Sequence, residues 1–268
     1  MMEHSDDQPI EQRPLGTTGI DVSVLGLGTV KLGRNEAVNY PSTFEIPDEA
    51  AARALLNLAK FLGINLLDTA PAYGTSETRL GTLLAGQRQE WVLATKVGET
   101  FADGASTYDF TPEHVQHSVK QSLQRIHTDY LDIVLIHSDG NDLEILNDRG
   151  TLDALLDLKA RGWIRAVGIS HKTSAGAERA IELGCDVIMA TLNLANTAES
   201  EIIATAGNAG CGVLVKKGFA SGHASIDSLR YAVTQPGVSS VVVGTINPEH
   251  LRANVRALDA LRASDGHT

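Results

Sequence analysis

The sequence has few of the features that stabilise small secreted modules or anchor a chain in a membrane. Its two cysteines, Cys185 and Cys211, are too few for a disulfide framework and form no CxxC pair. No stretch approaches the roughly 18 apolar residues of a membrane span. The acidic, polar N-terminus also has no apolar core of a signal peptide. These absences favour a cytoplasmic protein with no membrane partner.

Positive charge is scarce as well. Lysine and arginine number 22 against 33 aspartates and glutamates, which gives a net charge of −11. Nucleic acids and anionic membranes require clustered positive charge, so neither is expected as the main partner. His114 and His117 are three residues apart on one helix face, but no third ligand accompanies them, and no metal site is predicted.

What the chain does contain is an alternation of short apolar runs and segments of helical period. Eight runs are mostly continuous in hydrophobic residues, which is typical of parallel strands covered on both faces. They span residues 22–28, 64–69, 91–97, 131–137, 164–170, 186–192, 212–217 and 239–245. Because a helix signal follows each run, we expect one closed (β/α)₈ TIM barrel over residues 13–268. A disordered tail is predicted for residues 1–12.

Local signals support this organisation. Residues 13–22 form a predicted hairpin with Thr18-Gly19 in its turn, closing the bottom of the barrel. Thr111 and Pro112 suit the first positions of a helix. The runner-up, an open dinucleotide-binding sheet, is disfavoured because Lys31 stands where the third glycine of GxGxxG belongs.

Polar residues end three successive runs, where barrel enzymes place their reactive groups. Asp68 ends the second run and is followed by Tyr73, while Lys96 and His137 end the third and fourth. An ammonium about 4 Å from a phenolate attracts it by about 4 kcal/mol at an effective dielectric of 20, so Lys96 should lower the pKa of Tyr73 by up to roughly three units. Asp68 would keep Lys96 charged, and His137 would orient a carbonyl oxygen. This set suits proton donation to a carbonyl.

The same residues lie in sequence blocks that resemble the aldo-keto reductase family over almost the whole chain. The blocks are Gly26–Thr29, Leu67–Gly74, Ala94–Gly98, Asp129–Asp132 with Ile136-His137, Arg165–Ser170, and Gly244-Thr245 with Leu251 and Asn254. The resemblance implies a TIM barrel that reduces small carbonyl compounds with a nicotinamide cofactor, usually NADPH. It also implies Tyr73 as general acid, tuned by Lys96 and Asp68, with His137 positioning the substrate. A monomer or weak homo-oligomer is expected.

The resemblance further implies a set of cofactor-binding residues. They are Gly28, Thr29, Asp68, Ser170, His171, Lys216, Lys217, Gly218, Gly244, Thr245, Asn247, His250 and Asn254. Several depart from the family pattern: His171 replaces an asparagine, Met189 a glutamine, and the Lys216 region a stacking aromatic residue. Lys216 or Lys217 could instead contact the pyrophosphate. Asn247 and His250 stand where a cation usually binds the 2′-phosphate of NADPH, so NADH is possible too.

Two other functions fit the same residues. An NAD-dependent sugar or alcohol dehydrogenase would run the reaction in reverse. A non-catalytic barrel that senses the cofactor would keep the fold and the nucleotide groove without turnover. The polar segment 138–150 and the short C-terminus after the last helix predict an open, weakly selective pocket.

Overall fold

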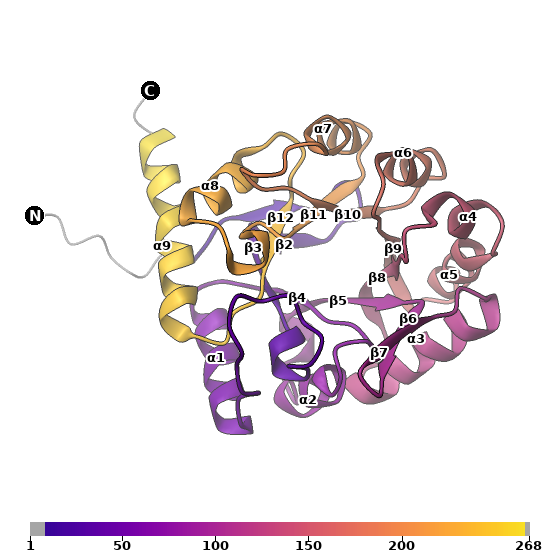
Figure 1. The fold of residues 1–268 in the computed structure, drawn as a ribbon, viewed down its shortest axis with the longest axis horizontal. Coiled ribbons are helices and arrows are strands. Elements are labelled where there is room, and N and C mark those ends of the chain that lie inside the picture. Colours follow the sequence, from indigo (N-terminus) through magenta and orange to yellow (C-terminus); the bar gives the residue numbers. More distant parts are fainter. Residues whose placement is uncertain (1–8, 266–268) are drawn as a thin grey trace, which may run out of the picture.

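Eight parallel strands close into a barrel at the centre of the molecule (Figure 1). The computed structural model describes residues 9–265. The barrel strands are β3 (Leu25–Gly28), β4 (Leu66–Asp68), β5 (Val92–Val97), β8 (Leu131–His137), β9 (Ile164–Ser170), β10 (Val187–Thr191), β11 (Gly212–Lys216) and β12 (Ser240–Val243). They follow one another around the barrel in chain order, and β12 pairs with β3 to close it. Each expected apolar run therefore contains a barrel strand, and the predicted (β/α)₈ fold is confirmed.

Helices surround this barrel (Figure 1). They are α1 (Glu49–Phe61), α2 (Ser76–Leu83), α3 (Pro112–Ile126), α4 (Asp142–Asn147), α5 (Thr151–Ala160), α6 (Ser174–Glu182), α7 (Ser200–Asn208), α8 (Ile226–Thr234) and α9 (Pro248–Asp265). Three short 3₁₀ helices, η1 (Val30–Leu32), η2 (Arg88–Glu90) and η3 (Ala220–Gly222), lie in the loops of the described chain. The expected cap is present, because the Thr111 hydroxyl accepts the His114 N–H at 3.3 Å.

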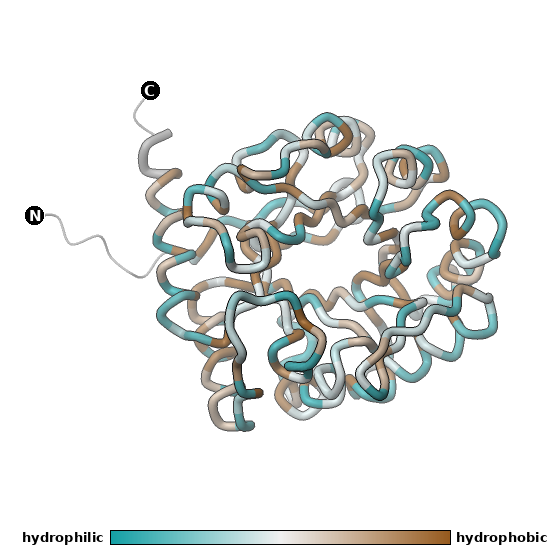
Figure 2. The backbone as a smooth tube through the Cα atoms, viewed as in Figure 1, coloured by the Kyte–Doolittle hydropathy of each residue, from teal (hydrophilic) through white to brown (hydrophobic). Residues whose placement is uncertain are grey.

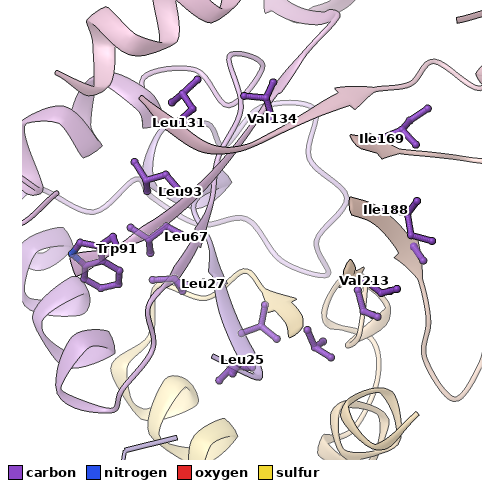
Figure 3. Close-up of a cluster of buried hydrophobic side chains, with 14 of the residues drawn as sticks. Leu25, Leu27, Leu67, Trp91, Leu93, Leu131, Val134, Ile169, Ile188 and Val213 are labelled. Carbon is purple, nitrogen blue, oxygen red and sulfur yellow. The ribbon is translucent and has the colours of Figure 1, made fainter. Parts of the chain in front are cut away.

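The strands are buried on both faces, which explains their continuous apolar sequence. Outward side chains such as Leu27, Leu67 and Val134 belong to one cluster that also contains the inner helix residues (Figure 3). Inward side chains, among them Leu66 and Ile133, fill the barrel interior as a second cluster. Hydropathy follows this division, with brown strands inside and teal stretches on the surrounding helices (Figure 2).

The N-terminal hairpin closes one end of the barrel. Strands β1 (Gln12–Pro14) and β2 (Asp21–Ser23) pair antiparallel, and Leu15, Ile20 and Val22 pack against the interior cluster. Residues 1–8 of the predicted tail lie outside the described residues. Within the described residues that precede Arg13, the buried Ile10 donates its N–H to the Leu62 carbonyl at 3.1 Å.

Two elements were not expected from the sequence. One is a hairpin of β6 (Glu99–Ala102) and β7 (Ala105–Tyr108), which directly follows β5. The other is α4, which occupies part of the segment expected to be a polar loop. None of the helices in residues 9–265 is both long and apolar enough to cross a lipid bilayer.

Candidate active site

A cavity of about 940 Å³ opens at the carboxyl ends of the barrel strands. Asp68, Tyr73, Lys96 and His137 all line it. Three of them lie on neighbouring strands, since β4 pairs with β5 and β5 with β8. The topology thus brings together side chains that are far apart in the sequence, at the end of the barrel where such enzymes hold their reactive groups.

Lys96 and Asp68 form a buried ion pair. The ammonium donates hydrogen bonds to Asp68 Oδ1 at 2.7 Å and to the Thr69 carbonyl at 2.8 Å. Only 2% of the Lys96 side chain and 6% of the Asp68 side chain are exposed. Burial lowers the pKa of Lys96, but the charges of Asp68 and Tyr73 and the hydrogen bonds to them outweigh it and leave the pKa raised. Lys96 is therefore an ammonium at neutral pH.

Tyr73 lies in the loop after β4, directly above this pair. Gly74 has a φ of +61°, and a Cβ there would collide with the Gly33 carbonyl, so the loop requires glycine beside the tyrosine. Lys96 Nζ is 4.7 Å from the Tyr73 ring centroid, and the His137 ring packs edge-on at 6.3 Å between centroids.

The pKa of Tyr73 differs from the expectation. Burial raises it most strongly, and the charge and hydrogen bond of Lys96 lower it without compensating fully, so the net shift is upward. The expected lowering by Lys96 is present, but the predicted net direction is wrong because burial penalises the phenolate. Tyr73 thus keeps its proton at neutral pH, which is the form that a general acid needs.

His137 ends β8, and its ring lies beside that of Tyr73 in the cavity wall. Its Nδ1 lies 2.7 Å from Oε2 of Glu99, a residue of the β6–β7 hairpin. Burial lowers the pKa of His137 below its usual 6.5, and Lys96 adds to this effect while Glu99 opposes it. Glu99 was not among the residues expected at the site. Its signal in the sequence, a carboxylate just beyond the strand that ends near Lys96, is weak.

The opposite wall is built from the ends of β9, β10 and β11. Lys216 Nζ donates to Ser170 Oγ at 2.9 Å and to the His171 carbonyl at 2.7 Å. Burial lowers the pKa of Lys216 to about 8, against the charge of Glu199, which raises it. Lys216 therefore points inward between strand ends instead of lying in a solvated loop.

His171 is buried in the same wall, and neither of its ring nitrogens has a hydrogen-bond partner among the described residues. Burial, with Lys216 nearby, lowers its pKa to about 4. Glu199 Oε2 is 3.8 Å from His171 Nε2 and accepts the Thr191 N–H at 2.7 Å. Glu199 was not expected either, because it lies on the segment beyond β10 and not on a strand end.

Most of the expected cofactor residues line the cavity. These are Gly28, Asp68, Ser170, His171, Lys216, Lys217, Gly218, Gly244, Thr245, His250 and Asn254. Thr29 and Asn247 do not. The Thr29 hydroxyl bonds to the Asp68 carbonyl at 2.9 Å inside the barrel wall, and Asn247 Oδ1 accepts the Glu249 N–H at 2.9 Å at the start of α9. Both side chains therefore stabilise the backbone around the cavity instead of lining it.

Two features of the cavity could hold polar groups of a ligand. Gly244 and Thr245 precede the N-terminus of α9, where backbone N–H groups and the helix dipole favour a phosphate. The unpartnered nitrogens of the buried His171 are free to bond a polar ligand group. Arg252 lies near this loop, but it is already paired with a carboxylate, because its Nε is 4.0 Å from Glu249 Oε1.

The chain is similar to known proteins in sequence and in fold. The sequence model described as the Aldo/keto reductase family matches residues 24–227. The crystal structure of a candidate aldo-keto reductase from Pseudomonas aeruginosa is 47% identical in sequence, with a TM-score of 0.88. The match covers 97% of this chain and 100% of that one. An uncharacterised oxidoreductase of Bacillus subtilis is 28% identical over 96% of this chain and 94% of its own length. An NADH-specific methylglyoxal reductase of Escherichia coli is 31% identical over 71% of this chain and 61% of its own.

Proposed function

Because the chain belongs to the aldo/keto reductase family, we propose that it reduces aldehydes or ketones to alcohols with Tyr73 as the general acid. The family and the oxidoreductase names of the relatives support NAD(P)H-dependent carbonyl reduction. The observation that carries the assignment of the residues is the buried Lys96–Asp68 ion pair beneath the Tyr73 ring.

Each residue of the site has a separate role in the proposed carbonyl reduction. When bound, the nicotinamide supplies a hydride to the carbonyl carbon. As the electron pair of the C=O bond moves to the oxygen, that oxygen takes the proton of the Tyr73 hydroxyl. The ammonium of Lys96 stabilises the phenolate that this transfer leaves behind, and Asp68 keeps the ammonium charged. His137 positions the substrate beside Tyr73.

The second wall of the cavity would hold the cofactor. Ser170, His171 and Lys216 line the cavity with polar groups, and Gly244 and Thr245 offer backbone N–H groups for phosphate. We propose NADPH as the cofactor, as is usual in the family, with NADH accepted as well. The second part of this proposal rests on Asn247 and His250, which replace the usual fixed cation for a 2′-phosphate.

The test is a titration of the purified protein with the two reduced and the two oxidised nicotinamide dinucleotides, followed by a panel of aldehydes. We expect submicromolar to micromolar binding of NADPH and oxidation of the reduced cofactor with matching alcohol formation. Tight cofactor binding without turnover of any aldehyde would contradict the proposal and favour a sensing barrel. Faster oxidation of alcohols with NAD⁺ would favour the dehydrogenase.

A further inference from the structure

Lys216 reaches across the carboxyl end of the barrel. It is the last residue of β11, and its side chain spans the neighbouring strand β10 to reach the end of β9 (Figure 1). There its ammonium donates to Ser170 Oγ at 2.9 Å and to the His171 carbonyl at 2.7 Å. Ser170 is the register partner of His137 on β8. Because paired strands lie about 4.8 Å apart, Lys216 is close to the part of the cavity that His137 and Tyr73 line.

The positive charge of Lys216 has no close counter-charge. Among the side chains that the structure describes, no carboxylate forms an ion pair with it, whereas Lys96 has Asp68 at 2.7 Å. Burial lowers the pKa of Lys216 to about 8, and the charge of Glu199, which acts from farther away, raises it. A ligand in the cavity therefore meets a cation that the protein does not neutralise by direct contact.

The other charged groups near Lys216 come from several elements. Lys217 follows it in the chain and Lys96 lies on β5, and after burial their charges lower the pKa of Lys216 further. Asp142, at the start of α4, raises it. His171 adds no charge at neutral pH, because burial and the nearby Lys216 lower its pKa to about 4.

We propose that Lys216 makes the site discriminate between the two redox forms of the nicotinamide cofactor, by opposing the positive charge of the oxidised ring. The reduced ring is neutral, while the phosphates and sugars of the two forms are the same. Hydride transfer to a carbonyl held by Tyr73 and His137 requires the ring in this part of the cavity, where the ammonium acts on it. The inference rests on the proposed function, and it assigns to Lys216 the preference for the reduced form.

Glu199 opposes this effect. Its carboxylate lines the same cavity and is held in place by the Thr191 N–H, which it accepts at 2.7 Å. A negative charge attracts the oxidised ring and leaves the neutral ring almost unaffected. Removing the charge of Lys216 and removing that of Glu199 should therefore change the preference in opposite directions.

The first test is calorimetric titration of the purified protein with NADPH and with NADP⁺ at pH 7. The quantity compared is the dissociation constant of the oxidised form divided by that of the reduced form, in which the contributions of the shared phosphates cancel. We expect a ratio above one in the parent. In Lys216→Met it should fall about tenfold, the order expected for two like charges several ångströms apart in a partly solvated site.

Three further variants separate charge from shape. Lys216→Arg keeps the positive charge and should keep most of the ratio. Glu199→Gln keeps an acceptor oxygen for Thr191 but loses the negative charge, so the ratio should rise severalfold. Lys120→Met removes the same charge as Lys216→Met from the exposed face of α3 and should leave the ratio unchanged.

The second test needs only the wild-type chain. Because the pKa of Lys216 is about 8, its repulsion is present below that pH and is lost above it. The ratio should therefore fall as the pH rises from 7 to about 9.5, and it should stay constant in Lys216→Met. Burial lowers the pKa of His137 and the charge of Asp68 helps to raise that of Lys96, so neither changes its charge in this range.

Equal ratios in the parent and in Lys216→Met, or a parental ratio that does not change with pH, would overturn the inference. Either result would leave the proposed function intact if the protein still reduced aldehydes. If the protein bound neither form of the cofactor, the proposed function itself would fail, and this inference with it.

Discussion

At the scale of single residues, the proposed role of Tyr73 as general acid depends on the charge of Lys96. Lys96 reaches both Asp68 and the tyrosine from inside the barrel wall, with almost no exposure to solvent. Bulk water therefore contributes little to stabilising a phenolate at this position, and the ammonium must do so. The same burial that makes the ion pair effective also keeps the phenol protonated in the resting protein.

Replacing Lys96 by methionine should lower kcat by at least about a hundredfold. The phenolate that forms when Tyr73 releases its proton would then have no ammonium beside it to stabilise it. Steady-state kinetics measure this loss. The variant also leaves Asp68 buried without a partner, at a cost of about 3 kcal/mol in the free energy of unfolding. A Lys96→Met/Asp68→Asn double variant serves as the control for stability. Parental kcat in the single variant would contradict the role of Lys96.

His171 gives a prediction for stability against pH. Its pKa is about 4 when folded and near 6.5 in an unfolded chain, so between these values the unfolded state binds more protons. The contribution of the neutral His171 to the free energy of unfolding is therefore fully present above pH 6.5. It falls by about 3 kcal/mol as the pH falls toward 4. Urea unfolding at several pH values should show a flatter dependence for His171→Asn. Equal slopes for both proteins would exclude this contribution.

At the scale of elements, a side chain from α4 holds the start of α6. The buried Asp142 accepts hydrogen bonds from the N–H of Thr173 at 2.8 Å and from its hydroxyl at 2.6 Å, and from the N–H of Lys172. Thr173 in turn caps α6 by accepting the Gly176 N–H. These contacts anchor the loop that follows β9, which carries His171.

Asp142→Ala should therefore lower the free energy of unfolding by about 2 kcal/mol, because the donors of Lys172 and Thr173 lose their buried acceptor. Asp142→Asn keeps an oxygen at the same place and should lose less. Chemical denaturation monitored by circular dichroism measures both. If the two variants were equally stable, the hydrogen bonds of Asp142 would not be what anchors α6.

The elements that sequence reasoning found are those with a strong local signal. Barrel strands such as β8 are continuous apolar runs, and their polar terminal residues, among them Asp68 and His137, mark the rim. The β6–β7 hairpin lacks a continuous apolar run. Side chains of β6 are alternately half-buried and exposed, and those of β7 are all exposed. The contact between Glu99 and His137 could not be predicted from the sequence for the same reason. The net pKa shift of Tyr73 depends on burial, which no local pattern reports.

At the scale of the whole molecule, the closed sheet links the first barrel strand to the last. The pairing of β3 with β12 and the filled interior leave no boundary inside the described chain where contacts are few. The expected single domain over residues 13–268 stays a prediction that unfolding experiments can test. Trp91 is buried before β5 and Trp163 is partly buried before β9, so the two fluorophores report on different parts of the barrel.

We expect the barrel to unfold in one cooperative transition. Urea midpoints from far-ultraviolet circular dichroism and from the fluorescence of Trp163 in a Trp91→Phe variant should coincide. The reciprocal Trp163→Phe variant reports on the other part of the barrel and should give the same agreement. Separate midpoints for the two tryptophans would reveal independently folding parts.

The central claim, that the Tyr73 hydroxyl gives its proton to the carbonyl oxygen, is tested most directly by Tyr73→Phe. This change removes one oxygen from a ring that otherwise keeps its packing against His137. Turnover of a good aldehyde substrate and the dissociation constant of the reduced cofactor are measured on the same preparation. The account predicts a loss of at least about a hundredfold in kcat with cofactor affinity within about twofold of the parent. A variant that oxidised the reduced cofactor at the parental rate would contradict it.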